Sequence, residues 1–135
     1  IGRLCVNNDC MLHLVKPLGF SLDAKYLKRA GLDYWKHLHL YVHENIDDFF
    51  DFSRNADVYI FTTHGNKLLW DCPLKQSSFL IFGNESSGLP ELFHKRFARN
   101  SYKIPMIGKN ARSMNLANAA SVVIYEGIRK NKFLS

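Results

Sequence analysis

Apolar residues occur in short runs along the 135-residue chain, separated by polar or amphipathic stretches. Two of these runs alternate apolar and polar residues, as half-buried strands do. Two others are apolar almost throughout, which is typical of strands buried on both faces of a parallel sheet. A fifth run, over 102–107, is a short strand or an extended segment and is interrupted by Pro105. Strands are therefore expected over residues 11–15, 38–42, 57–61, 78–82 and 102–107.

Helical patterns lie between the first strands. Apolar residues recur at helical spacing over 22–30, and Gly31 is expected to end the helix. Asn45 is expected to cap a short helix, because the following Asp47 and Asp48 suit a helix N-terminus.

Two further helices are expected towards the C-terminus. Pro90 suits the first turn of a helix over 90–97. The last helix, over 114–130, ends with Arg129 and Lys130, which the helix dipole favours. Strands that alternate with helices predict an α/β fold with a mostly parallel sheet flanked by helices.

Three of the expected strands are followed by loops of small or hydrogen-bonding residues, "TTHG", "GNESSG" and "IGKNARSMN". Ligands of open α/β sheets bind outside the carboxyl ends of the strands, so these loops form a candidate site. Gly83 and Gly88 would let a ligand approach the main chain closely, or would only make a tight turn. Their spacing matches neither the dinucleotide-binding pattern nor the P-loop, because Leu89 stands where the P-loop requires Lys.

Ser113 and Asn115 lie two residues apart just before the last helix. Such residues usually cap a helix. The helix that follows is rich in small side chains, which allow the close approach of a ligand or another subunit. Both interpretations stay open on the residues alone.

The composition of the chain limits the classes of protein to which it can belong. Apolar residues make up 47% of the chain and charged residues 22%, as in ordinary globular domains. No apolar run approaches the roughly 20 residues of a membrane span. The net charge of +6 favours nucleic acid or anionic surfaces as partners. Three cysteines without metal-type spacing indicate reduced thiols in a cytoplasmic protein and no metal site.

Two segments carry a family resemblance. "FGNESSGLP" (82–90) and "IPMIGKNARSMNLANAASVVIYEGIRK" (104–130) resemble the second and third signature motifs of the SPOUT superfamily of RNA methyltransferases. Residues 1–20 resemble the end of the first motif and the strand that follows it, and 27–35 also resembles this group. The chain is most similar to the small bacterial enzymes that methylate the ribose 2′-hydroxyl of tRNA wobble nucleotide 34, a cytidine or uridine.

The resemblance implies a fold and partners that composition does not. It implies one SPOUT domain over 1–135 with a deep C-terminal trefoil knot, S-adenosylmethionine as cofactor, and a homodimer acting on the anticodon region of tRNA. The family's N-terminal strand is expected to be missing from this chain, which starts two residues before the motif arginine. The alternatives are methylation of another tRNA position or of ribosomal RNA, and a non-catalytic RNA-binding domain.

The resemblance also assigns roles to residues. Arg3, Ser113 and Asn115 match the catalytic positions, and Arg3 suits a phosphate or a developing alkoxide better than the role of a base, because guanidinium stays protonated. Glu85 matches the motif-2 glutamate, with a solvated turn carboxylate as the alternative. The cofactor contacts expected by position are Phe61, Thr62, Gly83, Asn84, Glu85, Gly88, Ile104, Met106, Ser113, Met114 and Leu116.

Other candidates rest on residue type alone. His64 follows a strand end and is a weaker candidate for a general base than for a plain turn residue. An exposed aromatic such as Tyr34 or Trp35 could stack on a flipped base. Basic side chains could contact tRNA phosphates or simply form solvated faces; they are Lys25, Lys28, Arg29, Lys95, Arg96 and Arg99.

Overall fold

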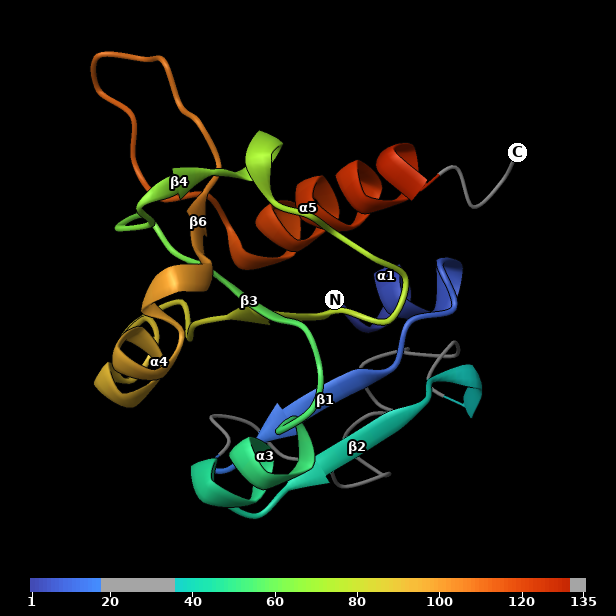
Figure 1. Ribbon diagram of the computed structural model, residues 1–135. Coiled ribbons are helices and arrows are strands. Elements are labelled where there is room, and N and C mark those ends of the chain that lie inside the picture. The colour runs from blue at the N-terminus through green and yellow to red at the C-terminus, as the bar shows by residue number, and fades with distance from the viewer. Residues whose placement is uncertain (18–35, 132–135) are drawn as a thin grey trace. The chain divides into compact units, whose positions relative to one another are not determined.

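The computed structural model describes residues 1–17 and 36–131, and its chain divides into two compact units, 1–54 and 55–135 (Figure 1). The helix expected over 22–30 lies outside the described residues, as do Lys25, Lys28, Arg29, Tyr34 and Trp35. No helix among the described residues is long and apolar enough to cross a membrane.

The first unit is a parallel strand pair with short helices. It contains α1 (Gly2–Asn7), β1 (Leu12–Val15), β2 (Leu40–His43) and α3 (Ile46–Phe52). The strands pair in register from Leu12 with Leu40 to Val15 with His43. The Asn45 Oδ1 accepts a hydrogen bond from the backbone N–H of Asp48 at 2.8 Å, which confirms the expected cap. Helix α1 was not predicted.

A histidine pair joins the two strands of this unit. Nδ1 of His13 lies 3.0 Å from Nε2 of His43, which is 3% exposed. Aromatic rings surround the pair, with Phe49 and Phe52 of α3 at ring-centroid distances of 5.2 and 5.1 Å from His43. Burial and the neighbouring His43 lower the pKa of His13. Burial also lowers the pKa of His43, although Asp48 opposes that shift.

The second unit is built on a four-stranded sheet in the order β4-β6-β3-β5, in which every pairing is parallel. Strand β6, the last in sequence, lies between β3 and β4. Among the described residues, strand β5 pairs only with β3 and so lies at an edge of the sheet. It was expected to be fully buried but is half-buried, because an edge strand is covered on fewer sides. The strands are β3 (Val58–Phe61), β4 (Lys67–Leu68), β5 (Phe79–Phe82) and β6 (Ser101–Lys103).

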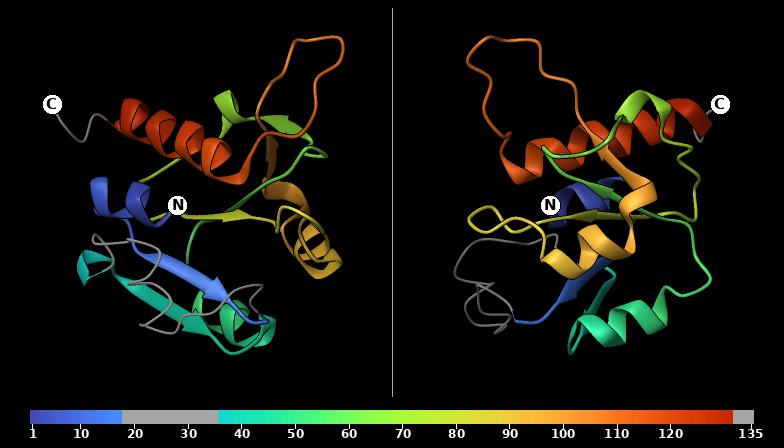
Figure 2. Two further views of the ribbon diagram at one scale, coloured as in Figure 1. Left: turned by 180° about the vertical axis from the view of Figure 1, so that it is seen from behind. Right: turned by 60° about the vertical axis from the view of Figure 1, so that its left-hand side comes forward.

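Helix α5 (Leu116–Asn131) packs its buried residues Ala120 and Val123 inward, and Val123 belongs to the unit's core cluster. Its C-terminal end is fixed by Lys130, whose Nζ donates to the carbonyls of Trp70 and Cys72 at 2.7 Å each. Figures 1 and 2 show α5 in red and the segment 104–115 that precedes it as a long projecting loop in orange. The remaining elements of this unit are η2 (Leu69–Asp71), α4 (Glu91–Arg96) and η3 (Ala98–Asn100).

Several elements differ from expectation. Strand β6 ends at Lys103 instead of 107, because its pairing stops before Pro105. Helix α4 begins at Glu91, with Pro90 as its N-cap residue. The two-residue strand β4 was not predicted, because it is too short to show a hydrophobic period.

The histidine pair predicts that stability depends on pH. The pKa of both imidazoles is lower in the folded chain than the ordinary value of 6.5, so the unfolded chain binds more protons below that pH. The free energy of unfolding should therefore fall as the pH decreases from about 7.5 to about 5.5. Urea denaturation at several pH values should show a weaker fall in His13→Gln and an unchanged fall in His64→Gln, whose histidine is exposed. An equal slope in both variants would contradict this role for the pair.

Candidate active site

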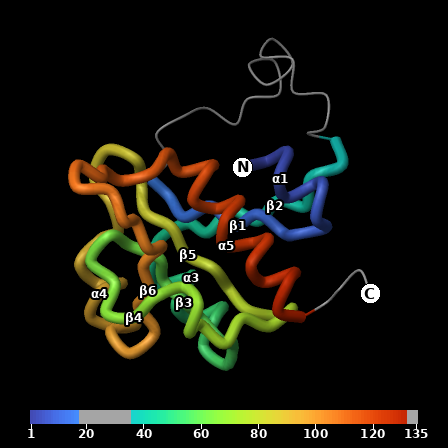
Figure 3. Tube along the Cα trace, turned by 90° about the horizontal axis from the view of Figure 1, so that it is seen from above, coloured from blue at the N-terminus to red at the C-terminus, as the bar shows by residue number. Residues whose placement is uncertain are grey.

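A cavity of about 430 Å³ lies within the second unit at the carboxyl ends of β3, β5 and β6. This size is typical of pockets that hold small molecules and cofactors. Figure 3 shows the loop after β5, in yellow, beside the segment before α5, in orange. Every residue that the sequence assigned to the cofactor site lines this cavity, together with Asn115; they are Phe61, Thr62, Gly83, Asn84, Glu85, Gly88, Ile104, Met106, Ser113, Met114, Asn115 and Leu116.

Four further lining residues were missed by sequence analysis. Thr63, Phe82 and Leu89 are immediate neighbours of predicted residues, so extending each predicted segment by one residue would have included them. Ala119 follows Leu116 by three residues and shares its side of α5. A helical projection of the last helix would have found it.

The loop after β3 is held against β6. The backbone N–H of Thr62 donates to the Tyr102 carbonyl at 3.0 Å, and that of Gly65 donates to the Thr62 carbonyl at 3.0 Å. A Cβ at Gly65 would overlap the backbone of Tyr102 and Lys103, so only glycine fits this turn. The backbone N–H of His64 donates to Thr62 Oγ1 at 3.3 Å, and His64 does not line the cavity. The geometry therefore favours a turn histidine over a general base.

The loop after β5 closes on itself through its two glycines. Asn84 and Gly88 exchange backbone hydrogen bonds of 3.2 and 2.8 Å. A Cβ at Gly83 would overlap the backbone of Gly88 and Leu89, whereas Gly88 has open space around it but a φ of +70°. Gly83 is thus required by close packing within the loop and Gly88 by its left-handed conformation. The tight-turn interpretation accounts for both glycines, and the turn that they form borders the cavity.

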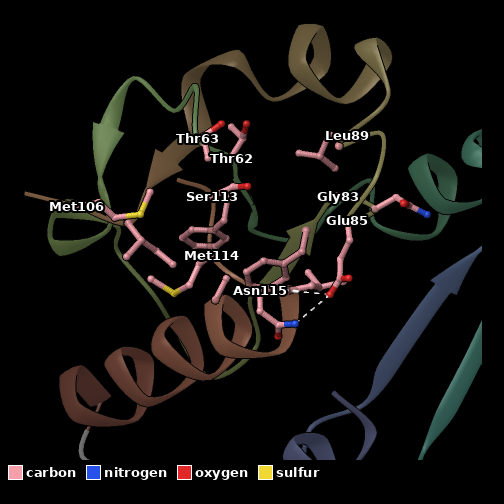
Figure 4. A pocket seen from close by; sticks show the side chains of 16 residues that line it. Thr62, Thr63, Gly83, Glu85, Leu89, Met106, Ser113, Met114 and Asn115 are labelled. Carbon is pink, nitrogen blue, oxygen red and sulfur yellow. Dashed lines mark hydrogen bonds between the residues drawn. The ribbon is translucent and has the colours of Figure 1, made fainter. Parts of the chain in front are cut away.

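Glu85 connects this loop to the start of α5. Its Oε1 accepts from the backbone N–H of Leu116 at 3.3 Å and from Asn115 Nδ2 at 3.4 Å. Figure 4 shows the side chains of Glu85 and Asn115 pointing towards each other across one side of the cavity. A carboxylate at a helix N-terminus is favoured by the unpaired N–H groups and the helix dipole.

Asn115 is the N-cap of α5. Its Oδ1 accepts from the backbone N–H groups of Ala117 at 2.9 Å and Asn118 at 3.3 Å. The capping interpretation of this residue is confirmed, and its amide also contacts Glu85. Ser113 lines the cavity from the loop just before the cap. One asparagine therefore both starts the helix and fixes the third cavity segment.

The cavity has an apolar floor and a polar rim. The stacked rings of Phe61 and Phe82, with centroids 5.4 Å apart, join the floor to the hydrophobic core. Of the described residues that line it, Glu85 is the one with a formal charge, and none is Lys or Arg. The site therefore suits a ligand with an apolar or aromatic body and a positive charge, and it lacks the cations that hold phosphates.

Arg3 lies apart from this set of residues in the chain. It is exposed on α1 of the first unit, whereas the cavity is formed wholly by residues of the second. Among residues 1–17 and 36–131, no group of three or more His, Cys, Asp or Glu side chains is arranged to hold a metal ion.

Comparison with known proteins assigns the chain to a family. Residues 1–125 match the model of the SpoU rRNA Methylase family. The chain belongs to this family. It is 42% identical to the tRNA (cytidine(34)-2′-O)-methyltransferase of Saccharophagus degradans and 40% identical to that of Methylovorus glucosotrophus, covering 98% of this chain and 86% of each relative.

A solved structure extends the similarity to the fold. It comes from a study of 2-OH methylation of C/U34 on tRNA, and it superimposes with a TM-score of 0.84 at 41% identity. The match covers 96% of this chain and 84% of the other. The SpoU fold is therefore shared along almost the whole length of the chain.

The two loop glycines predict different costs on substitution. In Gly88→Ala the methyl group meets open space, so only the left-handed backbone should cost about 1–2 kcal/mol. Gly83→Ala should lower the free energy of unfolding further, because its methyl group overlaps backbone atoms that cannot rotate away. Urea denaturation of the two variants measures the difference. A smaller loss in Gly83→Ala than in Gly88→Ala would show that the loop is built differently.

Proposed function

We propose that this protein transfers a methyl group from S-adenosylmethionine to the ribose 2′-hydroxyl of nucleotide 34, a cytidine or uridine, in a tRNA. The observation that carries the proposal is the cavity at the carboxyl ends of β3, β5 and β6, with its apolar floor, single carboxylate and no lining cation. The names of the relatives and family membership over residues 1–125 support the reaction and the substrate.

The lining residues fit the cofactor chemically. An adenosyl group suits the apolar floor around Phe61 and Phe82, and backbone groups of the loops after β5 and β6 can recognise its base. Glu85 provides a negative charge for a cationic ligand. When bound, S-adenosylmethionine supplies a methyl group on a positively charged sulfur. The protein's own contribution is to position the hydroxyl and to stabilise the charge that develops on its oxygen.

The catalytic roles belong to few side chains. Arg3 binds a substrate phosphate or stabilises the developing alkoxide, because its planar guanidinium stays protonated and donates in pairs. Ser113 holds the ribose or the cofactor from the cavity rim. Asn115 acts largely by holding the start of α5, since its Oδ1 already accepts two backbone hydrogen bonds.

The family's architecture is part of the proposal. Residues 1–135 are proposed to act as one methyltransferase domain, since the family model spans both compact units. The C-terminal segment is proposed to form a deep trefoil knot. The insertion of the late strand β6 between β3 and β4, followed by the long segment 104–115, supports this. A tRNA substrate implies an enzyme of the cytoplasm.

A second candidate is ribose methylation of ribosomal RNA, which the family description favours. A non-catalytic RNA-binding role is disfavoured by the complete cavity. Incubation of the protein with S-adenosylmethionine and unmodified tRNA transcripts, followed by mass spectrometry of ribonuclease fragments, should detect 2′-O-methylation at position 34. The same assay with ribosomal RNA is the comparison. Methylation of ribosomal RNA alone would replace the first proposal with the second.

Substitutions should separate substrate binding from cofactor binding. Arg3→Ala should lower the single-turnover rate roughly a hundredfold or more, because one preorganised charged contact is lost, with cofactor affinity close to normal. Arg3→Lys should recover only part of the rate, because an ammonium keeps the charge but not the paired donors. Ser113→Ala should weaken both cofactor affinity and rate. Calorimetry and rate measurements on each variant provide the test, and a matching loss of cofactor affinity in Arg3→Ala would exclude a separate substrate role.

The protein is also proposed to work as a two-fold homodimer that uses α5. Several apolar side chains of this helix are only half-buried, and Tyr125 is 51% exposed. Such a surface is typical of an interface between subunits. The half-buried residues are Leu116, Val122, Ile124 and Ile128.

Sedimentation at micromolar concentration should show a dimer. Tyr125→Asp should shift it to a monomer, because a charge would be buried in the interface. Asn55→Asp adds the same charge at an exposed position outside α5 and should leave the dimer intact. A wild-type monomer would exclude this assembly.

A further inference from the structure

We propose that a second, basic cavity formed by α4 and η3 binds backbone phosphates of the RNA substrate. This inference rests on the proposed function and adds a specific RNA surface to it. The cavity has a volume of about 400 Å³ and is lined by residues 95–100, of which Lys95, Arg96 and Arg99 are cationic and exposed.

The charge of the chain is concentrated in the unit that holds this cavity. Residues 55–135 contain eleven Lys and Arg against five Asp and Glu, whereas residues 1–54 contain seven of each. The net charge of +6 therefore belongs entirely to the second unit. Because the cofactor cavity has no lining cation, this excess charge is available for a different, anionic partner.

The segment that lines the basic cavity, residues 95–100, is held in place by side chains from other elements. Lys67 Nζ donates to the carbonyl of Arg99 at 2.9 Å, and Asn66 Nδ2 donates to that of Ala98 at 3.3 Å. Asn100 Nδ2 donates to the Val58 carbonyl at 3.0 Å and so fixes η3 to the start of β3. The backbone that presents Arg99 is thus anchored to two strands, which reduces the ordering needed when a ligand binds.

Neither a recorded ion pair nor the dipole of α4 accounts for the charge of Arg99. Within residues 1–17 and 36–131, the recorded ion pairs join Lys16 to Glu44, Lys75 to Asp57 and Arg129 to Glu126. None includes Lys95 or Arg99. The C-terminal dipole of α4 favours cations in its last turn, which ends at Arg96, but Arg99 lies beyond that turn in η3.

The position of the cavity indicates a polymeric ligand. It is anchored at Val58, the first residue of β3, whereas the cofactor cavity begins at Phe61, the last. Three steps along a strand separate the two points by roughly 10 Å. The two cavities are therefore separate, and a substrate that extends over several nucleotides can contact both at once. RNA does so and presents a phosphate at every nucleotide.

The test compares two variants of equal charge. Lys95→Gln/Arg99→Gln removes two cations from the basic cavity. Arg54→Gln/Lys75→Gln removes two exposed cations elsewhere. Fluorescence anisotropy measures tRNA affinity between about 50 and 200 mM salt, the range over which phosphate contacts weaken most visibly. Calorimetry measures S-adenosylmethionine affinity, and sedimentation with phosphatidylserine vesicles measures binding to an anionic lipid surface.

The first variant should bind tRNA at least tenfold more weakly at low salt and lower the slope of log K against log salt by about 1–2, since two phosphate contacts are lost. Its cofactor affinity should stay normal, and the control variant should keep the wild-type slope. If the salt slope is unchanged in this variant while the wild-type protein methylates tRNA, the basic cavity does not bind RNA phosphates, and the proposed function still stands. Lost vesicle binding with unchanged tRNA affinity would overturn it in favour of a lipid surface. A wild-type protein that binds cofactor but neither binds nor methylates any RNA would overturn the proposed function itself.

Discussion

Parallel pairing of β3 with both β5 and β6 is the constraint on which the site depends. Parallel strands end at the same edge of a sheet, so three loops that are distant in sequence come together there. The central strand β3 is fully buried, and Ile60 is 0% exposed. Burial makes a slip in register costly, because every side chain would change face. The cavity's shape is therefore tied to the packing of the core beneath it.

Hydrogen bonds at the rim of the cavity hold together the loops that the parallel sheet brings to one edge. Glu85 reaches from the loop after β5 to the N-terminus of α5, and Asn115 caps that helix. Each bond is exposed and contributes little to stability on its own. Their effect is on position, because they hold two motif segments in one arrangement. The carboxylate also gives the cavity a negative charge inside a unit that carries a net positive charge. A cationic cofactor and a polyanionic substrate can thus bind to one unit without competing for the same charges.

Much of the site could be predicted from sequence because it lies where strong patterns end. The apolar runs of β3 and β5 stop abruptly at polar or glycine residues, and the motif resemblance supplied the third segment. The physical role of Gly83 could not be predicted, because it depends on contact with Gly88 and Leu89 in the folded loop. Helix α1 and strand β4 are too short for a periodic signal, and the edge position of β5 follows from sheet order alone.

One cavity in the second unit is proposed to hold the methyl donor beside the 2′-hydroxyl that receives it. A crystal structure with S-adenosylhomocysteine, the demethylated product, tests this most directly. The ligand should contact backbone groups of the loops after β5 and β6 and lie against Phe61 and Phe82. Its homocysteine sulfur should face the rim that carries Ser113 and Asn115. Binding at any other place on the chain, with this cavity vacant, would contradict it.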